Sequence, residues 1–218
     1  MTSVFDRPGG PMRVLDMANV QLFCLPYSGA SARVYLHWRN TLPAWLSVLP
    51  VELPGRAGRI GEPPQTDMVA LAGQLAGEIL PRITGPYALF GHGLGALLAF
   101  EMAHALRGAD APAPLALIAS GAAAPSRADT LLCEGYRYTL REPLECPIHV
   151  LGGASDTVTQ AQLIDWQLEG ASGFSLDVLP GGHLFIHQHE AKVLRMLRAC
   201  LERDGRRLSW PALRQASA

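Results

Sequence analysis

The segment Phe90-Gly91-His92-Gly93-Leu94-Gly95-Ala96 joins an apolar run at 86–90, typical of a buried strand, to a helical pattern at 94–106. Glycine at every second position lets a strand and a helix approach closely across a sharp turn. The residue at the centre of such a turn points into a cleft, near the positive end of the helix dipole. We therefore take this turn as the first candidate for a functional site.

Strand and helix patterns alternate on both sides of this turn. Strands are predicted at 21–25, 46–51, 86–90, 115–119, 148–151 and 174–179, and helices at 32–40, 68–79 (after the N-cap Asp67), 94–106 and 189–202. Such alternation requires crossover connections, so it predicts an α/β fold with a mostly parallel central sheet and helices on both faces. We expect one domain at 20–203, with loosely attached segments at 1–19 and 204–218.

Composition excludes several function classes. The 218 residues carry 18 Lys plus Arg against 19 Asp plus Glu, a formal net charge of -1, which argues against a nucleic-acid partner. No apolar run reaches the roughly 18 residues that span a bilayer, so no membrane partner is expected. The first 19 residues lack the apolar core of a secretory signal, and the four cysteines form no CxxC pair. We expect a soluble, cytoplasmic protein with reduced cysteines.

The turn at 90–96 fits two known motifs. It matches the G-x-S-x-G nucleophile elbow of α/β-hydrolases, except that Gly93 stands where that motif has serine. It also satisfies the dinucleotide-binding pattern G-x-G-x-x-G/A through Gly91, Gly93 and Ala96. Against the second interpretation, the motif follows the third strand and not the first, and the next strand ends in Ser120-Gly121 without an acid to hold a ribose.

Two further candidates lie downstream in the order that the hydrolase fold uses, acid before histidine. Asp156 follows the strand at 148–151, and His183 follows the strand at 174–179 within a Gly-Gly-His loop. A histidine there can accept and return a proton, and a carboxylate fixes its tautomer. Taken alone, each is more often an ordinary loop residue. The histidines His187 and His189 would lie on different helix faces, and no third metal ligand is evident.

Nearly the whole core, from about 22 to 201, resembles the type II thioesterases, the stand-alone editing hydrolases of nonribosomal peptide and polyketide biosynthesis. The matching blocks lie at 23–29, 53–56, 62–64, 86–92, 134–138, 146–148, 152–153 and 179–183. The resemblance implies an α/β-hydrolase of antibiotic-type pathways that removes stalled or wrongly primed acyl groups from phosphopantetheine arms. Its partners would be acyl or peptidyl carrier proteins. No organic cofactor and no metal are implied.

Carried over to this chain, the family's catalytic positions are Gly93 for the nucleophile, Asp156 for the acid and His183 for the base. The oxyanion hole would use the backbone N–H of Leu94 and one from the loop at Tyr27 or Ser28. His92, within the turn, is expected to pack or to line the cleft and contact substrate.

Gly93 departs from the family, whose members carry serine or occasionally cysteine at this position. Without an Oγ atom no acyl-enzyme forms, so we expect the chain as written to be inactive by the ordinary mechanism. A substitution made to inactivate the enzyme explains this glycine best, with a naturally inactive homologue as the alternative. Ser28 is a weaker candidate for a substitute nucleophile. Two other functions stay open: a noncatalytic protein that binds acylated carrier protein, and an esterase acting on free small esters.

The lid region, at about 121–135, is the second departure. The resemblance predicts lid helices after the strand that ends near Ser120, but only 121–133 precede the matching block at 134–138. We therefore expect a shortened or missing lid, or a segment absent from the sequence. In this family the lid forms the roof of the chamber that holds the acyl group. The family's preference for acyl chains of a given length therefore does not carry over to this chain.

Overall fold

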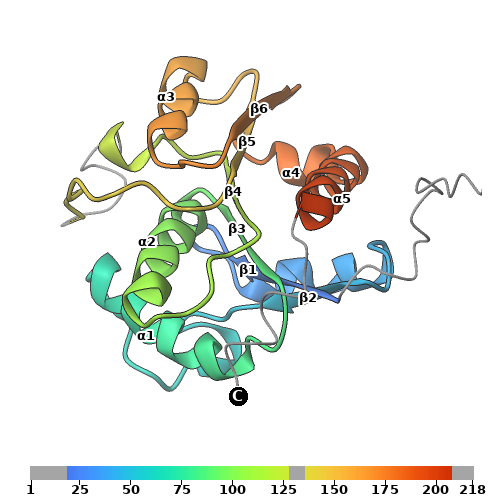
Figure 1. Ribbon diagram of the computed structural model, residues 1–218. Coiled ribbons are helices and arrows are strands. Elements are labelled where there is room, and N and C mark those ends of the chain that lie inside the picture. Colours follow the sequence, from blue (N-terminus) through green and yellow to red (C-terminus); the bar gives the residue numbers. More distant parts are fainter. Residues whose placement is uncertain (1–18, 128–135, 208–218) are drawn as a thin grey trace, which may run out of the picture.

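The computed structural model of the chain describes residues 19–127 and 136–207. Within these residues, six parallel strands form one sheet in the order β2-β1-β3-β4-β5-β6 (Figure 1). The strands are β1 (Val20–Leu25), β2 (Leu46–Pro50), β3 (Tyr87–His92), β4 (Ala116–Ser120), β5 (Ile148–Gly153) and β6 (Phe174–Leu179). Each overlaps a predicted strand, so the predicted parallel sheet is confirmed.

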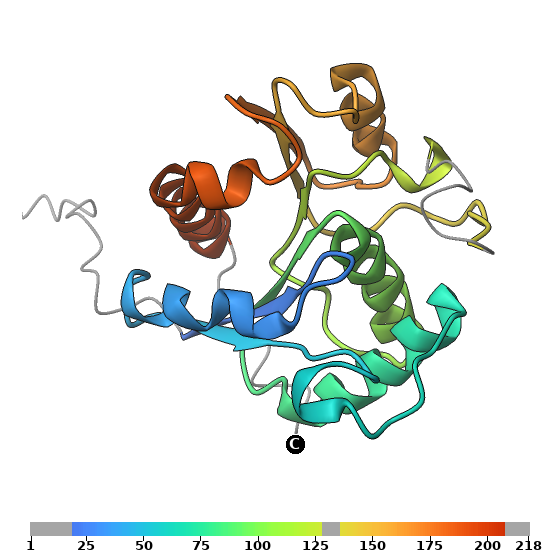
Figure 2. The ribbon, with the colours of Figure 1, turned by 180° about the vertical axis from the view of Figure 1, so that it is seen from behind.

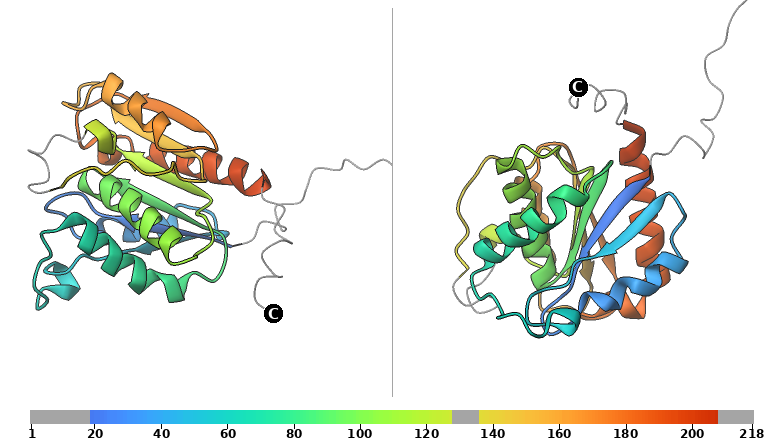
Figure 3. Two further views of the ribbon diagram at one scale, coloured as in Figure 1. Left: turned by 60° about the vertical axis from the view of Figure 1, so that its left-hand side comes forward. Right: turned by 90° about the horizontal axis from the view of Figure 1, so that it is seen from below.

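Helices cover both faces of this sheet, as predicted (Figure 3). Asp67 caps α1, because its carboxylate accepts a hydrogen bond from the N–H of Ala70 at 2.9 Å. The helix predicted at 32–40 is present as a 3-10 helix. The helices are α1 (Met68–Ile79), α2 (Leu94–Gly108), α3 (Gln160–Ile164), α4 (Phe185–Gln188) and α5 (Glu190–Arg207), with 3-10 helices η2 (Ala32–Asn40), η3 (Ala57–Arg59), η4 (Leu80–Arg82), η5 (Pro125–Arg127) and η6 (Asp165–Leu168).

Alternate residues of each strand point to opposite faces of the sheet and build two cores. On one face, α1 and α2 pack against side chains such as Phe23 and Leu89. On the other face, which Figure 2 shows from behind, lie η2, α4 and α5. They pack against side chains such as Leu22 and Phe90. Because the sheet is covered on both faces, its strands are apolar almost throughout.

The last helix extends beyond the expected end of the domain at 203. Helix α5 continues to Arg207, and Asp204 near its end is buried. Nε2 of His149 on β5 is hydrogen-bonded to Asp204 at 2.6 Å, and Nδ1 of the same ring to Ser175 on β6 at 2.7 Å. A loosely attached segment was expected from 204 onward, whereas these hydrogen bonds hold the helix end against the sheet. Of the loose segments expected at 1–19 and 204–218, residues 1–18 and 208–218 lie outside the described residues.

The expected lid region is only partly described. Residues 121–124, which follow β4, are buried, and η5 comes directly after them, whereas 128–135 lie outside the described residues. Cys24 and Cys146 are buried free thiols and Cys200 is a half-buried one, while Cys133 also lies outside the described part. None of the helices in the described ranges is long and apolar enough to cross a membrane.

The carboxyl ends of the strands bring the candidate residues to one edge of the sheet. Tyr27 follows β1, Gly93 follows β3, Gly121 follows β4, Asp156 follows β5 and His183 follows β6. Strand β1 lies between β2 and β3, so the strand order reverses there. Parallel sheets bind their ligands at this edge, next to such a reversal.

Candidate active site

The turn after β3 accepts only glycine at its two flanking positions. A Cβ atom on Gly91 would lie 1.9 Å from the carbonyl oxygen of Gly95, and one on Gly95 would lie 2.4 Å from that of Leu25. Gly93 between them has φ 53° and ψ −119°, a conformation that residues with side chains rarely adopt. The structure thus has the sharp strand–turn–helix connection that the sequence predicts at 90–96.

Asp156 and His183 form a hydrogen-bonded pair beside this turn. Nδ1 of His183 lies 3.0 Å from Oδ2 of Asp156, and the Asp156 side chain is only 1% exposed. The other carboxylate oxygen accepts the N–H of Val158 and the hydroxyl of Thr157, each at 3.3 Å. Because the carboxylate can only accept hydrogen bonds when ionised, Nδ1 carries the proton and Nε2 is left as the basic nitrogen.

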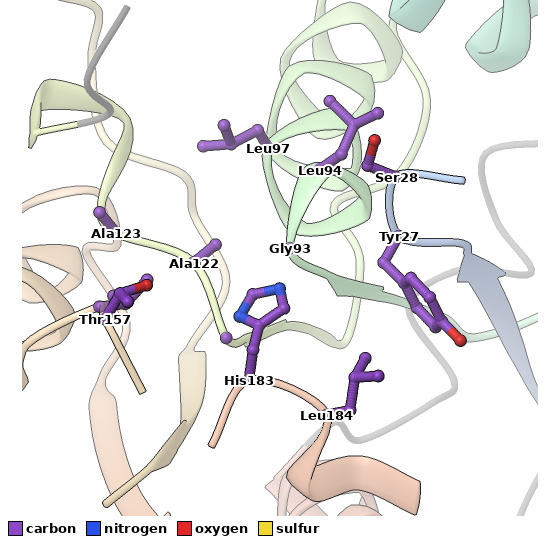
Figure 4. A pocket seen from close by; sticks show the side chains of 12 residues that line it. Tyr27, Ser28, Gly93, Leu94, Leu97, Ala122, Ala123, Thr157, His183 and Leu184 are labelled. Carbon is purple, nitrogen blue, oxygen red and sulfur yellow. The ribbon is translucent and has the colours of Figure 1, made fainter. Parts of the chain in front are cut away.

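The basic nitrogen faces Gly93. A Cβ atom placed on Gly93 would lie 3.2 Å from Nε2 of His183 and 3.6 Å from Cβ of Tyr27. In Figure 4 the imidazole of His183 lies next to Gly93, between Ala122 on one side and Tyr27 on the other. The structure therefore brings together the three residues that the sequence singled out for nucleophile position, acid and base.

The loops that carry the acid and the histidine are tied to one another. The N–H of Ser155 donates to the carbonyl oxygen of Gly181 at 2.9 Å, and the N–H of Ala154 donates to that of Leu179 at 2.8 Å. A Cβ atom on Gly153 would lie 2.5 Å from the carbonyl oxygen of Gly182. Gly153 thus allows the close approach of the two loops that carry Asp156 and His183.

A cavity of about 520 Å³ opens directly over Gly93 and His183 (Figure 4). Its walls are mainly apolar and come from the segments that follow β1, β3, β4, β5 and β6 and from the first turn of α2. The lining residues are Tyr27, Ser28, Gly93, Leu94, Leu97, Gly121, Ala122, Ala123, Thr157, Val158, His183 and Leu184. Apolar walls with few polar groups are typical of a small-molecule site.

Two backbone segments next to Gly93 could bind a developing negative charge. Leu94 is the first residue of α2, so its N–H has no carbonyl partner within the helix. Tyr27 and Ser28 border the same cavity from the loop after β1. These are the residues that the resemblance gives for an oxyanion hole, and that role stays a prediction.

The loop after β1 is held by charged side chains from the connection between β2 and α1. Nη1 of Arg56 donates to the carbonyl oxygens of Tyr27 at 3.1 Å and Ala30 at 2.7 Å. The Glu52 carboxylate accepts the hydroxyl of Ser31 and the N–H of Ala32. Because both ends of the loop are bound, its backbone is fixed relative to Gly93.

His92 lies behind the site, in place of the predicted contact with substrate. Its side chain is fully buried and is not among the residues that line the cavity. Nδ1 is hydrogen-bonded to Ser120 at 2.9 Å, and the ring packs against that of His183, with 4.9 Å between centroids. Burial, and then the neighbouring His183, lowers the pKa of His92 to about 3, so this ring is neutral.

His187, which the sequence brings up only in connection with metal binding, contacts the site. Its Nε2 lies 3.0 Å from the hydroxyl of Tyr27 and forms a hydrogen bond with it. Within the described ranges, no three histidine, cysteine or acidic side chains come together as metal ligands would. Leu97 and Val158 also line the cavity. Leu97 lies one helical turn after Leu94, and Val158 lies two residues after Asp156. These spacings from predicted site residues could have indicated both from the sequence.

Comparisons with known proteins agree on one family. The profile described as Thioesterase domain matches residues 20–131. The chain is 30% identical over 233 residues to "Linear gramicidin dehydrogenase LgrE" of Brevibacillus parabrevis, a match that covers 85% of this chain and 89% of that protein. That alignment is longer than the part of this chain it covers, so the relative contains internal residues without a counterpart here.

Solved structures give the same result. RedJ, the thioesterase from the prodiginine biosynthetic pathway in Streptomyces coelicolor, superposes with a TM-score of 0.79 at 30% identity, covering 89% of this chain and 91% of that chain. The type II thioesterase BorB from the borrelidin biosynthetic cluster gives a TM-score of 0.78 at 32% identity, covering 89% and 95%. The likeness therefore extends over most of the chain in both sequence and fold.

Proposed function

This chain belongs to the thioesterase family, and we propose that its substrates are acyl thioesters on the phosphopantetheine arms of carrier proteins. Its relatives are type II thioesterases of nonribosomal peptide and polyketide pathways. One observation carries the proposal: Nε2 of His183, held by the buried Asp156, faces the centre of an elbow turn beside an apolar cavity. That is the arrangement that acyl transfer requires.

With a serine at position 93, the site would carry out two-step hydrolysis. His183 would take the hydroxyl proton as Oγ attacks the thioester carbonyl carbon, and the oxyanion would face the N–H of Leu94. The thiol would leave with that proton, and water activated by the same nitrogen would release the acid. Asp156 would stabilise the imidazolium formed in each step.

Glycine at position 93 removes the first step, because no atom remains to form the acyl-enzyme. Loss of such a nucleophile costs on the order of 10⁶ in turnover, while the oxyanion hole and substrate binding retain a residual acceleration. We therefore propose that the chain is inactive by the two-step route, although the histidine–aspartate pair and the cavity are in place.

Hydrolysis of an acyl-phosphopantetheinyl carrier protein by the parent chain and by Gly93→Ser tests the proposal. We expect turnover only with Gly93→Ser, and loss of that turnover when His183→Ala is added as a control. Faster hydrolysis of the carrier-bound thioester than of a simple oxoester would support the carrier-protein substrate. A Gly93→Ser protein that melts like the parent and hydrolyses oxoesters only would indicate an esterase of free small esters.

Gly93 itself favours a second candidate function, that of a noncatalytic protein which binds acylated carrier protein. The cavity, the elbow and the histidine–aspartate pair persist without a nucleophile, so binding without turnover is chemically open to this chain. Titration of the parent chain with acylated and unacylated carrier protein distinguishes the two. Tight binding of the acylated form alone, with no turnover even by Gly93→Ser, would favour the binding role.

A further inference from the structure

We infer that this site transfers an acyl group directly from a thioester to a small primary alcohol, without an acyl-enzyme. The inference rests on the proposed function, because it uses the same thioester and the same cavity. It differs from that function in needing no side chain at position 93. Serine carries a CH₂OH group where glycine carries a hydrogen atom, and a small primary alcohol can supply such a group from solution.

The space for such an alcohol adjoins the base. The heavy atoms nearest to a Cβ position on Gly93 are Nε2 of His183 at 3.2 Å, Cβ of Tyr27 at 3.6 Å and Cε1 of His183 at 3.7 Å. Only one of these atoms is polar, and it is the basic nitrogen. Gly93 and His183 both line the cavity, so a molecule that enters can reach this nitrogen.

The base is oriented without help from residue 93. Nδ1 of His183 is bound to Asp156 at 3.0 Å, which turns Nε2 toward Gly93. In the described part of the chain, no hydrogen bond engages Nε2, and the nearby hydroxyl of Tyr27 is already bound to His187. Nε2 is therefore the acceptor that an incoming hydroxyl group meets.

The walls favour an alcohol over water as the bound nucleophile. Leu94, Leu97 and Val158 line the cavity near the elbow and offer no side-chain hydrogen bond. A water molecule there has Nε2 of His183 and the N–H of Leu94 as partners, the lower end of the two to four hydrogen bonds that hold ordered water, and it gains nothing from the apolar walls. An alcohol needs one acceptor for its hydroxyl group and buries its carbon against the apolar wall.

The step balances without any other reactant. The alcohol oxygen attacks the thioester carbonyl carbon while Nε2 of His183 takes the hydroxyl proton, and the carbonyl oxygen becomes an oxyanion facing the N–H of Leu94. The tetrahedral intermediate collapses, the carbon–sulfur bond breaks, and the sulfur takes the proton from His183. The products are an ester and a free thiol, and the site returns to its starting state.

The test incubates the parent chain with an acyl-pantetheine thioester and methanol, and measures the methyl ester by mass spectrometry. We expect ester formation that saturates with methanol and exceeds that of His183→Ala by about a hundredfold or more, the lower end of general-base effects. Gly93→Ala is the matched variant, because its Cβ would occupy the space 3.2 Å from Nε2. It should lose most of this rate, and tert-butanol should not react.

Several outcomes would overturn the inference. If the methyl ester forms equally fast in the parent chain and in His183→Ala, His183 is not the base of this reaction. If the rate is undiminished in Gly93→Ala, the alcohol does not occupy the space beside Gly93. If Gly93→Ala fails to fold, equal rates with methanol and tert-butanol in the parent chain refute the inference on their own. Absence of ester while Gly93→Ser hydrolyses the thioester refutes this inference alone, whereas silence of both proteins refutes the proposed function as well.

Discussion

Gly93 has the backbone of a nucleophile position and no side chain to act as one. Its φ of 53° lies in the region that residues with side chains rarely adopt, so any side chain at position 93 is strained. Gly91 and Gly95 are needed whatever residue stands between them, because a Cβ atom on either would meet backbone atoms. A serine there would need His183 to move by only a few tenths of an ångström, because the new Cβ would lie 3.2 Å from Nε2.

Gly95 provides a direct test of the turn. We predict that Gly95→Ala lowers the free energy of unfolding by about 3 kcal/mol or more, since its Cβ would lie 2.4 Å from the carbonyl oxygen of Leu25. Gly73→Ala is the control, because Gly73 lies within α1 with no atom inside 4 Å, and alanine there should stabilise by about 1 kcal/mol. Urea unfolding measures both. Equal effects of the two substitutions would contradict the steric account.

Two buried histidines make stability depend on pH. Burial lowers the pKa of His92 and of His104 to about 3 each, with further contributions from His183 and from Arg141 and Arg107, respectively. Below about pH 6.5 these histidines are protonated in the unfolded chain but stay neutral in the folded chain. The free energy of unfolding should therefore fall as the pH is lowered from about 6.5 toward 3, by up to about 1.4 kcal/mol per pH unit for each histidine.

Urea unfolding at pH 7, 6, 5 and 4 measures this slope. His104→Gln should show a shallower loss than the parent chain, because the glutamine amide does not titrate and can still accept a hydrogen bond from Arg107. An unchanged slope in His104→Gln would mean that His104 does not contribute.

At the scale of elements, the connection between β2 and α1 positions the loop after β1. Arg56 binds two carbonyl oxygens of that loop, and Arg59 binds the backbone of Glu52 as well as the carboxylates of Glu62 and Glu78. These contacts run from α1 to the cavity rim. The block at 53–56 that resembles the thioesterase family therefore has a structural reason in this chain.

We predict that Arg56→Met in a Gly93→Ser background lowers kcat by about 10², the cost of losing one oxyanion-hole donor, with a smaller change in KM. Arg56→Lys should recover part of the loss, because the lysine ammonium can still donate to these carbonyl oxygens but lacks the fixed geometry of the guanidinium group. Arg33→Met, at an exposed position on η2, is the matched control and should leave kcat unchanged. An unchanged kcat in Arg56→Met, measured with the same acyl thioester, would refute this role.

The elements were predictable where the local pattern was strong. The apolar strands and the amphipathic α1 follow from periodicity, and Asp67 is a cap with a local hydrogen bond. Helix α3 was missed because it is short, although Thr159 and Gln162 form a capping box that could have signalled it. The end of α5 was placed too early, since the hydrogen bond of Asp204 to His149 is made between residues far apart in sequence.

The site residues, like the elements, were predictable where a local sequence pattern indicates them. Asp156 and His183 each follow a strand in a glycine-containing loop, and parallel strands bring such loops together. The burial of His92 and the contact of Tyr27 with His187 depend on packing between segments, which no local pattern records. The catalytic roles of these residues stay predictions.

At the scale of the whole molecule, the two cores hold a rigid sheet whose carboxyl edge carries the site. Helices α1 and α2 pack on one face and α4 and α5 on the other, so each strand end is fixed from both sides. The relative LgrE contains internal residues that this chain lacks, and the shortened lid stays a prediction. We propose that the site of the missing residues is the region at 121–135.

Labelling with a serine-directed fluorophosphonate tests most directly whether this fold presents an active site complete except for one side chain. The account predicts that Gly93→Ser is labelled at position 93, that the parent chain is not labelled, and that adding His183→Ala slows the labelling by about 10² or more. Peptide mapping by mass spectrometry locates the adduct. A Gly93→Ser protein that melts like the parent and stays unlabelled, or labelling of the parent chain at Ser28, would contradict the account.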